Sequence, residues 1–281
     1  MNQTIKILKP TEFNEGLTLF VNAMGFTESF IPGMVDTAKF YYDQKLLFAF
    51  GLYENEELCG FGSIIFHKKN TWIPWVSVKS SKQGNGYGKK IMIELLGFMQ
   101  NKKRQTVELC ASNAGYPLYE KLGFQYQYHA NVYTIKSSKD IQLTNSDELF
   151  IETKLAGEKI PKWLIELDET SQGVNRKDYL EKQLNKEYII AGAPNKGFAI
   201  IANKKIGPIV AKDKEYAKNL FQTGLDLGID TVIPLEFSGE PSFVHELAEL
   251  ELVIQCRKMT YGPLPNQKHE FLYAIKSTAF G

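Results

Sequence analysis

The loop Gln83-Gly84-Asn85-Gly86-Tyr87-Gly88, followed directly by two lysines, constrains this chain more than any other stretch. Glycines at alternate positions leave the backbone N–H groups unobstructed, so that they can turn inward as a nest for an anion, usually a phosphate. After the loop, apolar residues recur at helical spacing, at positions 91, 92, 95, 96 and 99. The loop therefore precedes a helix N-terminus, which favours negative charge. We interpret it as a cradle for a pyrophosphate, with Lys89 adding positive charge.

Two better-known phosphate loops do not fit this spacing. A P-loop has four residues between its glycines and then Lys-Ser or Lys-Thr, whereas three residues separate Gly84 from Gly88 and two lysines follow. A Rossmann fingerprint, G-x-G-x-x-G, follows the first strand of its unit, whereas here the spacing is G-x-G-x-G and about three predicted strands come first. Taken alone, the loop is equally compatible with a glycine-rich surface turn.

The sequence on both sides of the loop narrows these alternatives. Residues 72–78 form a short apolar run of β-branched and aromatic residues before the loop, and residues 106–110 form a second such run after the helix, so we predict a strand at each. Pro117 then suits the first turn of a further helix, and Gly123 suits its C-terminal end. Strand, loop, helix, strand and helix thus follow one another.

Two motifs in this order resemble those of the GNAT acyltransferase superfamily, over residues 1–137. Val78, Gln83, Gly84, Gly86 and Gly88 match its acyl-CoA motif, although Ser80 stands where a proline is common. The segment 117–124, which reads PLYEKLGF, matches its second motif closely. The resemblance implies an N-acetyltransferase that uses acetyl-CoA, or another acyl-CoA, as co-substrate.

The resemblance also implies a mechanism, in which an amine attacks the thioester directly within a ternary complex. The cofactor-binding residues that it implies are Val76, Ser77 and Val78 along the pantetheine arm, Gln83, Gly84, Asn85, Gly86, Tyr87, Gly88 and Lys89 around the pyrophosphate, and Asn113 and Tyr119 on the far side. A backbone N–H of residues 76–78 would also stabilise the oxyanion. Tyr119 is the expected general acid, because a phenol with a pKa near 10 is protonated at pH 7 and can protonate the leaving thiolate.

The general base is left open among several candidates. His67 follows a predicted strand that leads toward the site, and its residue type titrates near neutrality. Glu108 lies on the strand beside the cofactor strand and could take the proton of the amine through water. Asp36 could bind a cationic amine, and a water chain without a dedicated base is a further alternative. We interpret Cys110 as a small buried hydrophobe, since no histidine stands at a partner position.

Composition excludes several other classes of protein. The chain of 281 residues has a net charge of +1, so it carries no bulk charge that would favour nucleic acid or a membrane surface. No apolar run approaches the roughly 20 residues that a membrane-spanning helix needs, and no signal peptide is visible. The three cysteines are scattered and lack ligand spacing, which indicates reduced thiols, a cytoplasmic location and no metal site.

The second half of the sequence repeats the order of elements in the first, in a degenerate form. Residues 196–201 resemble 59–65, and residues 206–211 stand where the cofactor strand is expected, but only Lys212-Asp213-Lys214-Glu215 follows in place of the glycine loop. We therefore predict an α/β protein of two tandem GNAT-like domains, each a mostly antiparallel mixed sheet flanked by helices. The predicted domains are residues 1–137, which bind acyl-CoA, and residues 141–281, which do not.

Two functions are compatible with this organisation. One is an N-acetyltransferase acting on a small-molecule or protein amine, and the other is a non-catalytic acyl-CoA-binding sensor. The intact Tyr119 and the complete glycine loop favour the enzyme. Aromatic residues 26, 30, 40, 41 and 42 suggest an apolar or aromatic acceptor, in a pocket formed by residues 20–42 and the second half. We expect a monomer or homodimer.

Overall fold

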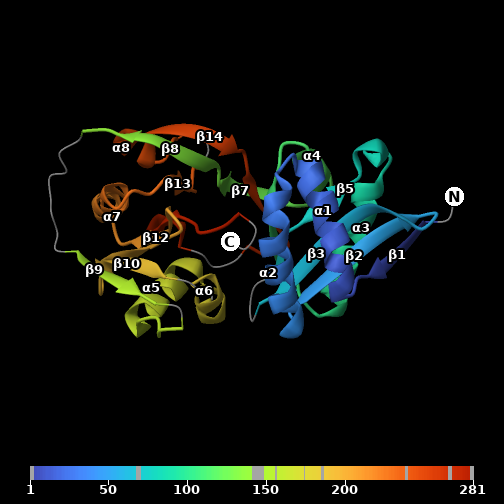
Figure 1. Ribbon diagram of the computed structural model, residues 1–281, viewed down its shortest axis with the longest axis horizontal. Helices are drawn as coiled ribbons and strands as arrows, with labels where there is room; N and C mark the ends of the chain where they lie inside the picture. Colours follow the sequence, from blue (N-terminus) through green and yellow to red (C-terminus); the bar gives the residue numbers. More distant parts are fainter. Residues whose placement is uncertain are drawn as a thin grey trace.

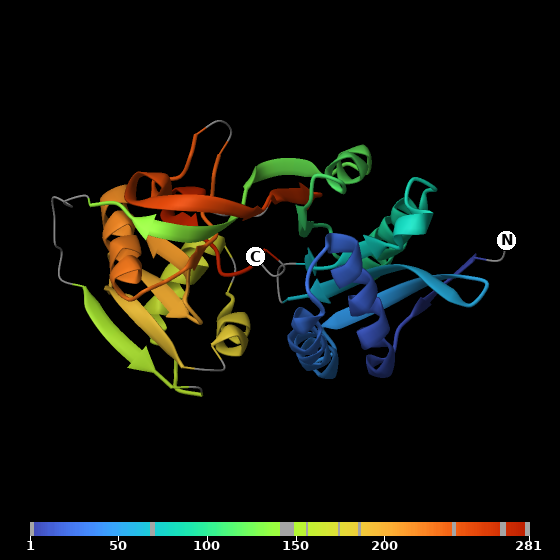
Figure 2. The same cartoon turned by 45° about the horizontal axis from the view of Figure 1, so that its top comes forward.

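The computed structural model describes residues 3–67, 71–140, 149–155, 157–173, 175–184, 187–237, 240–264 and 268–278. The described residues form two eight-stranded mixed sheets, each flanked by helices, as the sequence predicts. The two sheets and their helices lie side by side (Figures 1 and 2). No helix in the described ranges is long and apolar enough to span a membrane.

The first half contributes most of the first sheet. Its elements are β1 (Gln3–Ile7), α1 (Phe13–Met24), α2 (Ile31–Asp43), β2 (Leu47–Glu54), β3 (Glu57–Phe66), β4 (Thr71–Ile73), β5 (Val76–Val78), α3 (Tyr87–Asn101), β6 (Val107–Ala111), α4 (Tyr116–Lys121) and β7 (Gln125–His129). Short 3-10 turns lie at Pro10–Glu12, Glu28–Phe30 and Ser80–Lys82. The strand predicted at 72–78 is interrupted at Pro74, because proline has no N–H for the ladder.

The second half contributes most of the second sheet. Its elements are β8 (Val132–Ser138), β9 (Phe150–Lys154), α5 (Lys162–Gln172), α6 (Lys177–Gln183), β10 (Tyr188–Ala193), β11 (Gly197–Ala202), β12 (Lys205–Ala211), α7 (Lys214–Asp226), β13 (Thr231–Val232), α8 (Val244–Leu247), β14 (Ala248–Ile254), β15 (Arg257–Tyr261), a 3-10 turn (His269–Phe271) and β16 (Leu272–Ala274). Helix α8 ends at Leu247 and β14 follows at once, because Glu249, Leu250, Glu251 and Leu252 alternate with the period of a strand.

The two sheets exchange strands across the middle of the chain. The order in the first sheet is β1-β2-β3-β4-β6-β15-β7, so β15 from near the C-terminus lies between β6 and β7. The second sheet has the order β14-β8-β13-β12-β11-β10-β9 and thus takes β8 from the chain just after β7. Strands β7 and β8 therefore belong to different sheets, although only Ala130 and Asn131 separate them along the chain. The boundary at 137–140 stays a prediction, although Ser137 and Ser138 continue β8 rather than form a linker.

Helix packing positions the glycine loop at one end of the first sheet. The predicted apolar face of α3, residues 91, 92, 95, 96 and 99, is buried against one face of that sheet. Gly60 and Gly62 of β3 allow this close approach, since a Cβ at either would lie 2.4 Å from the Ile91 side chain. On the opposite face, a Cβ on Gly16 of α1 would lie 2.4 Å from the Phe61 side chain. Helix α3 and helices α1 and α2 thus cover opposite faces of the sheet.

Candidate active site

A gap opens in the first sheet between β5 and β6. Strand β4 pairs in parallel with β6, Trp72 with Glu108 and Ile73 with Leu109. After Pro74 the chain leaves β6, and β5 pairs only with β3 among the described strands. On the far side of the gap, Cys110 and Ala111 pair only with β15, along the opposite edge of β6. The facing edges of β5 and β6 therefore present backbone groups that the sheet does not use, as an extended ligand requires.

The glycine loop lies where β5 ends and α3 begins. Gly84 and Gly86 have φ values of +76° and +80°, in the left-handed region that favours glycine, and Gly86 is the N-cap of α3 without a side-chain cap. Gln83 Nε2 donates to the Val78 carbonyl at 3.1 Å, and Asn85 Nδ2 donates to the Gln83 carbonyl at 3.0 Å. These two side chains shape the loop, and its exposed backbone at the N-terminus of a fifteen-residue helix suits an anion.

Two predicted loop ligands differ in their placement. Lys89 is exposed beside the loop, as a countercharge requires. The Tyr87 side chain instead points away and is buried, and its hydroxyl donates to Glu54 Oε1 at 2.5 Å and accepts from Gln3 Nε2 at 2.8 Å. Lys82, Tyr87 and Gln3 bind Glu54 and lower the pKa of its carboxyl to about 2. Tyr87 thus supports the loop from behind, and only its backbone could contact an anion.

A cavity of about 710 Å³ lies beside the gap, between the two halves of the protein. The lining residues come from α1 to α2, from the strands at the gap, from α4 and from the second half: Phe20, Met24, Gly25, Phe26, Phe30, Gly33, Met34, Thr37, Ile73, Pro74, Trp75, Val76, Leu109, Cys110, Ser112, Tyr119, Val253, Ile254, Gln255, Cys256 and Thr278. Residues between 20 and 37 and residues of the second half contribute to this lining, whereas its use as an acceptor pocket stays a prediction. Phe40, Tyr41 and Tyr42 do not line it.

Tyr119 lies at the junction of the cavity and the gap. Its side chain is 7% exposed and packs against the ring of Phe124, with ring centroids 5.7 Å apart. Gly115 allows this position, since a Cβ there would lie 2.8 Å from the Tyr119 ring. Burial raises the pKa of the Tyr119 hydroxyl, and Cys256 adds to the rise. Tyr119 is therefore protonated at neutral pH and lines the cavity, as a proton donor must.

His67 does not lie at the cavity, which corrects the expectation that its strand leads there. Gly60 to Gly62, near the start of β3, pair with β5, and the strand then runs away from the gap. His67 follows five residues after Gly62, about 16 Å further along. Its ring packs between Tyr41 and Tyr179, at centroid distances of 5.7 and 6.3 Å. This placement separates His67 from Tyr119.

Glu108 is also unavailable as a free base at the cavity. Its side chain is 1% exposed, and its Oε1 lies 2.8 Å from Nζ of the equally buried Lys258. The Lys258 ammonium lies 3.7 Å from the centroid of the Trp72 ring. Lys258 belongs to β15, so the sequence separation hid this ion pair from pattern analysis. The structure thus gives Glu108 a role in joining the two halves.

Segment 253–257 brings the second half to the cavity. Asn113 Nδ2 donates to Gln255 Oε1 at 2.6 Å, and Arg257 donates to Asn113 Oδ1. Asn113, a predicted ligand of the pantetheine arm, therefore already bridges to this segment. A hydrogen bond with Cys110 and burial raise the pKa of the Cys256 thiol. Cys110 itself is only half-buried and lines the cavity, so it is more exposed than the small buried hydrophobe that the sequence predicted.

The corresponding gap in the second sheet is filled by the chain itself. Strands β12 and β13 pair in parallel at Lys205–Thr231 and Ile206–Val232, as β4 and β6 do. Beyond that point β16 lies between them, pairing with β12 and bonding to residues 233–235 through its backbone. At the start of α7, Asp213 Oδ1 accepts from the Tyr216 N–H at 2.8 Å. A carboxylate therefore stands where the first half presents open N–H groups.

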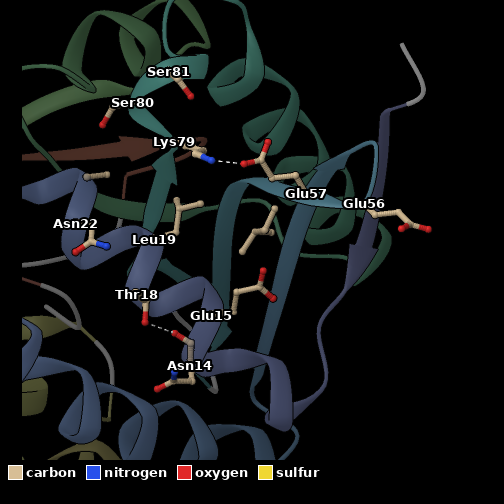
Figure 3. A pocket seen from close by; sticks show the side chains of 12 residues that line it. Asn14, Glu15, Thr18, Leu19, Asn22, Glu56, Glu57, Lys79, Ser80 and Ser81 are labelled. Atoms are coloured by element: carbon tan, nitrogen blue, oxygen red, sulfur yellow. Dashed lines mark hydrogen bonds and ion pairs between the residues drawn. The ribbon is translucent and has the colours of Figure 1, made fainter.

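A second hollow of about 850 Å³ lies on the outer side of α1 (Figure 3). It extends from α1 across the β2–β3 turn to Lys79, Ser80 and Ser81, just before the glycine loop. Glu15, Glu56 and Glu57 line it, and Glu57 is paired with Lys79 (Figure 3). Its carboxylates make it a poor site for phosphate. At this end of the first sheet, the glycine loop is therefore the one part of the described chain that suits a phosphate.

Comparisons with known proteins agree with this geometry. Family models described as "Acetyltransferase (GNAT) domain" match residues 47–126 and 164–274. The chain belongs to the GNAT acetyltransferase superfamily and contains two domains of this kind.

Solved structures extend the likeness to the whole chain. A protein from Pyrococcus horikoshii, provisionally named an acetyltransferase, is 25% identical with a TM-score of 0.81, covering 99% of this chain and 96% of that one. A GCN5-related N-acetyltransferase from Anabaena variabilis is 13% identical with a TM-score of 0.63, covering 92% of this chain and 72% of that one, and this likeness concerns the fold alone. Among curated proteins, no match to the sequence was found.

Proposed function

We propose that the protein is an N-acetyltransferase that transfers an acetyl group from acetyl-CoA, or another acyl group from its CoA thioester, to a primary amine. The observation that carries the proposal is the open gap between β5 and β6, which has the glycine loop at one end and the cavity with Tyr119 beside it. The name of the Pyrococcus horikoshii protein, which is similar over nearly its whole length, supports the same activity. The chemistry is assigned to the first half.

The residues of the first half each have a part in this reaction. The backbone of Val76, Ser77 and Val78 would pair with the pantetheine arm, and one of its N–H groups would stabilise the oxyanion. The loop from Gln83 to Gly88, with Lys89, would hold the pyrophosphate at the start of α3. Tyr119 would protonate the departing thiolate. The amine would attack from the cavity, on the side of α1 and α2.

The test measures thiol release from acetyl-CoA with a panel of amines, together with acetyl-CoA binding by calorimetry. Gly86→Glu should abolish both, because it places a carboxylate in the anion nest at a φ that glycine favours. Gly228→Glu is the matched control, since Gly228 has a φ of +76° with equally open space but lies in the second half. Saturable binding without turnover of any amine would favour the alternative, a non-catalytic acyl-CoA sensor.

A further inference from the structure

Resting on the proposed function, we propose that the acceptor is an aromatic amine whose nitrogen is uncharged at neutral pH, an arylamine, and that it binds in the cavity of about 710 Å³ between the two halves. A hollow of this size suits a small molecule.

Aromatic side chains form one wall of the cavity. The rings of Phe20, Phe26 and Phe30 follow one another edge to face, with centroid distances of 6.3 and 6.1 Å. Trp75 lies on the sheet side, and Met24 and Met34 are also in the lining. Phe30 is 58% exposed, which is unusual for so large an apolar side chain. An aromatic ligand would bury these rings and make edge-to-face contacts of the same kind.

The lining carries no formal charge. Of the lining residues that the structure describes, none is Asp, Glu, Lys, Arg or His, and the polar groups are neutral hydroxyls, thiols and one amide. An alkylamine, with a pKa near that of lysine at about 10.4, would enter as a cation, and no carboxylate in this lining would balance its charge. Glu108 is held by Lys258, and His67 lies at the far end of β3. The cavity therefore favours an amine that is already neutral.

A neutral arylamine also removes the need for a strong base. Its nitrogen lone pair attacks the thioester carbonyl carbon, so that a C–N bond forms and the C–S bond breaks. The departing sulfur takes a proton from Tyr119, and the proton that the nitrogen loses passes through water to restore Tyr119. The products are the N-aryl amide and the free CoA thiol, with no net gain or loss of protons.

The experiment compares four acceptors with the full-length protein and acetyl-CoA: p-anisidine, tryptamine, spermidine and a lysine-containing peptide. We expect kcat/KM for p-anisidine to exceed that of each cationic amine by about tenfold or more at pH 7. Preference for spermidine, the peptide or tryptamine would overturn the arylamine inference while leaving the proposed function intact. Binding of acetyl-CoA without turnover of any acceptor would instead overturn both.

A charge introduced into the cavity tests where the amine binds. Thr37→Glu, on α2 in the lining, should lower kcat/KM for p-anisidine and raise it for tryptamine, shifting their ratio by about tenfold. Thr37→Gln controls for size, and Gln44→Glu places the same charge on an exposed residue at the end of α2. Circular dichroism establishes that each variant is folded. An unchanged ratio in folded Thr37→Glu would overturn the placement of the acceptor in this cavity.

Discussion

Lys258 Nζ lies 2.8 Å from Glu108 Oε1, and both side chains are almost completely buried where the second half of the chain enters the first sheet. The backbones around them pair as well, because β6 and β15 are antiparallel neighbours with Glu108 opposite Thr260. An ion pair in the interior depends on both partners, since a charge left alone there is poorly solvated. Two residues separated by 150 positions thus hold one sheet together.

Removing one partner of this pair should strongly destabilise the protein. We expect Lys258→Met to lower the free energy of unfolding in urea by about 3 to 5 kcal/mol, because it leaves the Glu108 carboxylate buried and alone. The double variant Lys258→Met/Glu108→Leu should recover most of this loss. Lys136→Met breaks an exposed ion pair with Glu251 and should cost less than about 1 kcal/mol. Equal losses in the two single variants would contradict this account.

Tyr119→Phe should slow turnover without weakening cofactor binding. The variant keeps the ring against Phe124 but removes the proton donor, so kcat should fall by about 10² to 10⁴, while the Kd of acetyl-CoA stays the same. Tyr116→Phe is the matched control on the same helix, since the Tyr116 hydroxyl donates to Glu120 on the surface. Full turnover in Tyr119→Phe, with an unchanged pH profile, would remove Tyr119 from the mechanism.

The contacts that Glu54 makes with Tyr87 behind the glycine loop should be sensitive to acid. The folded protein lowers the pKa of Glu54 from its ordinary value of 4.5 to about 2. The ionised carboxylate therefore contributes stability that is complete above pH 4.5 and lost as the pH falls toward 2. We expect urea unfolding of Glu54→Gln to show a smaller decrease in stability across this window than wild type. Glu56→Gln, an exposed change in the adjacent turn, should retain the wild-type decrease; the same slope in both variants would contradict the prediction.

Each chain should bind a single acetyl-CoA. The gap in the first sheet is open, whereas β16 occupies the corresponding position in the second sheet and Asp213 caps α7. Calorimetric titration should therefore give a stoichiometry close to one. A second binding event that survives Gly86→Glu would show that the second half also binds the cofactor.

Local features of the fold could be predicted from the sequence, whereas its long-range pairing could not. The apolar face of α3 and the glycine loop depend on neighbours within a few residues, and both were predicted correctly. Pairing of β15 with β6 joins residues about 150 positions apart, and no local sequence pattern predicts it. The apolar run of β3 likewise predicts a strand but not which end of it lies beside the gap, so His67 was misplaced. The Glu108 carboxylate was misjudged because its partner, Lys258, belongs to that same distant strand.

The exchanged strands make the two halves dependent on each other. A fragment that stopped at residue 140 would leave β7 without its only partner among the described strands, and the cavity would lose the lining that residues 253–256 and Thr278 contribute. Under the proposed function, the half that lacks a glycine loop would therefore help to determine which acceptor the other half takes. Substitutions in the segment 253–256 could change the choice of acceptor while every residue assigned to the reaction stays the same. Under the proposed function, a second domain without a cofactor site would remain open to selection for specificity.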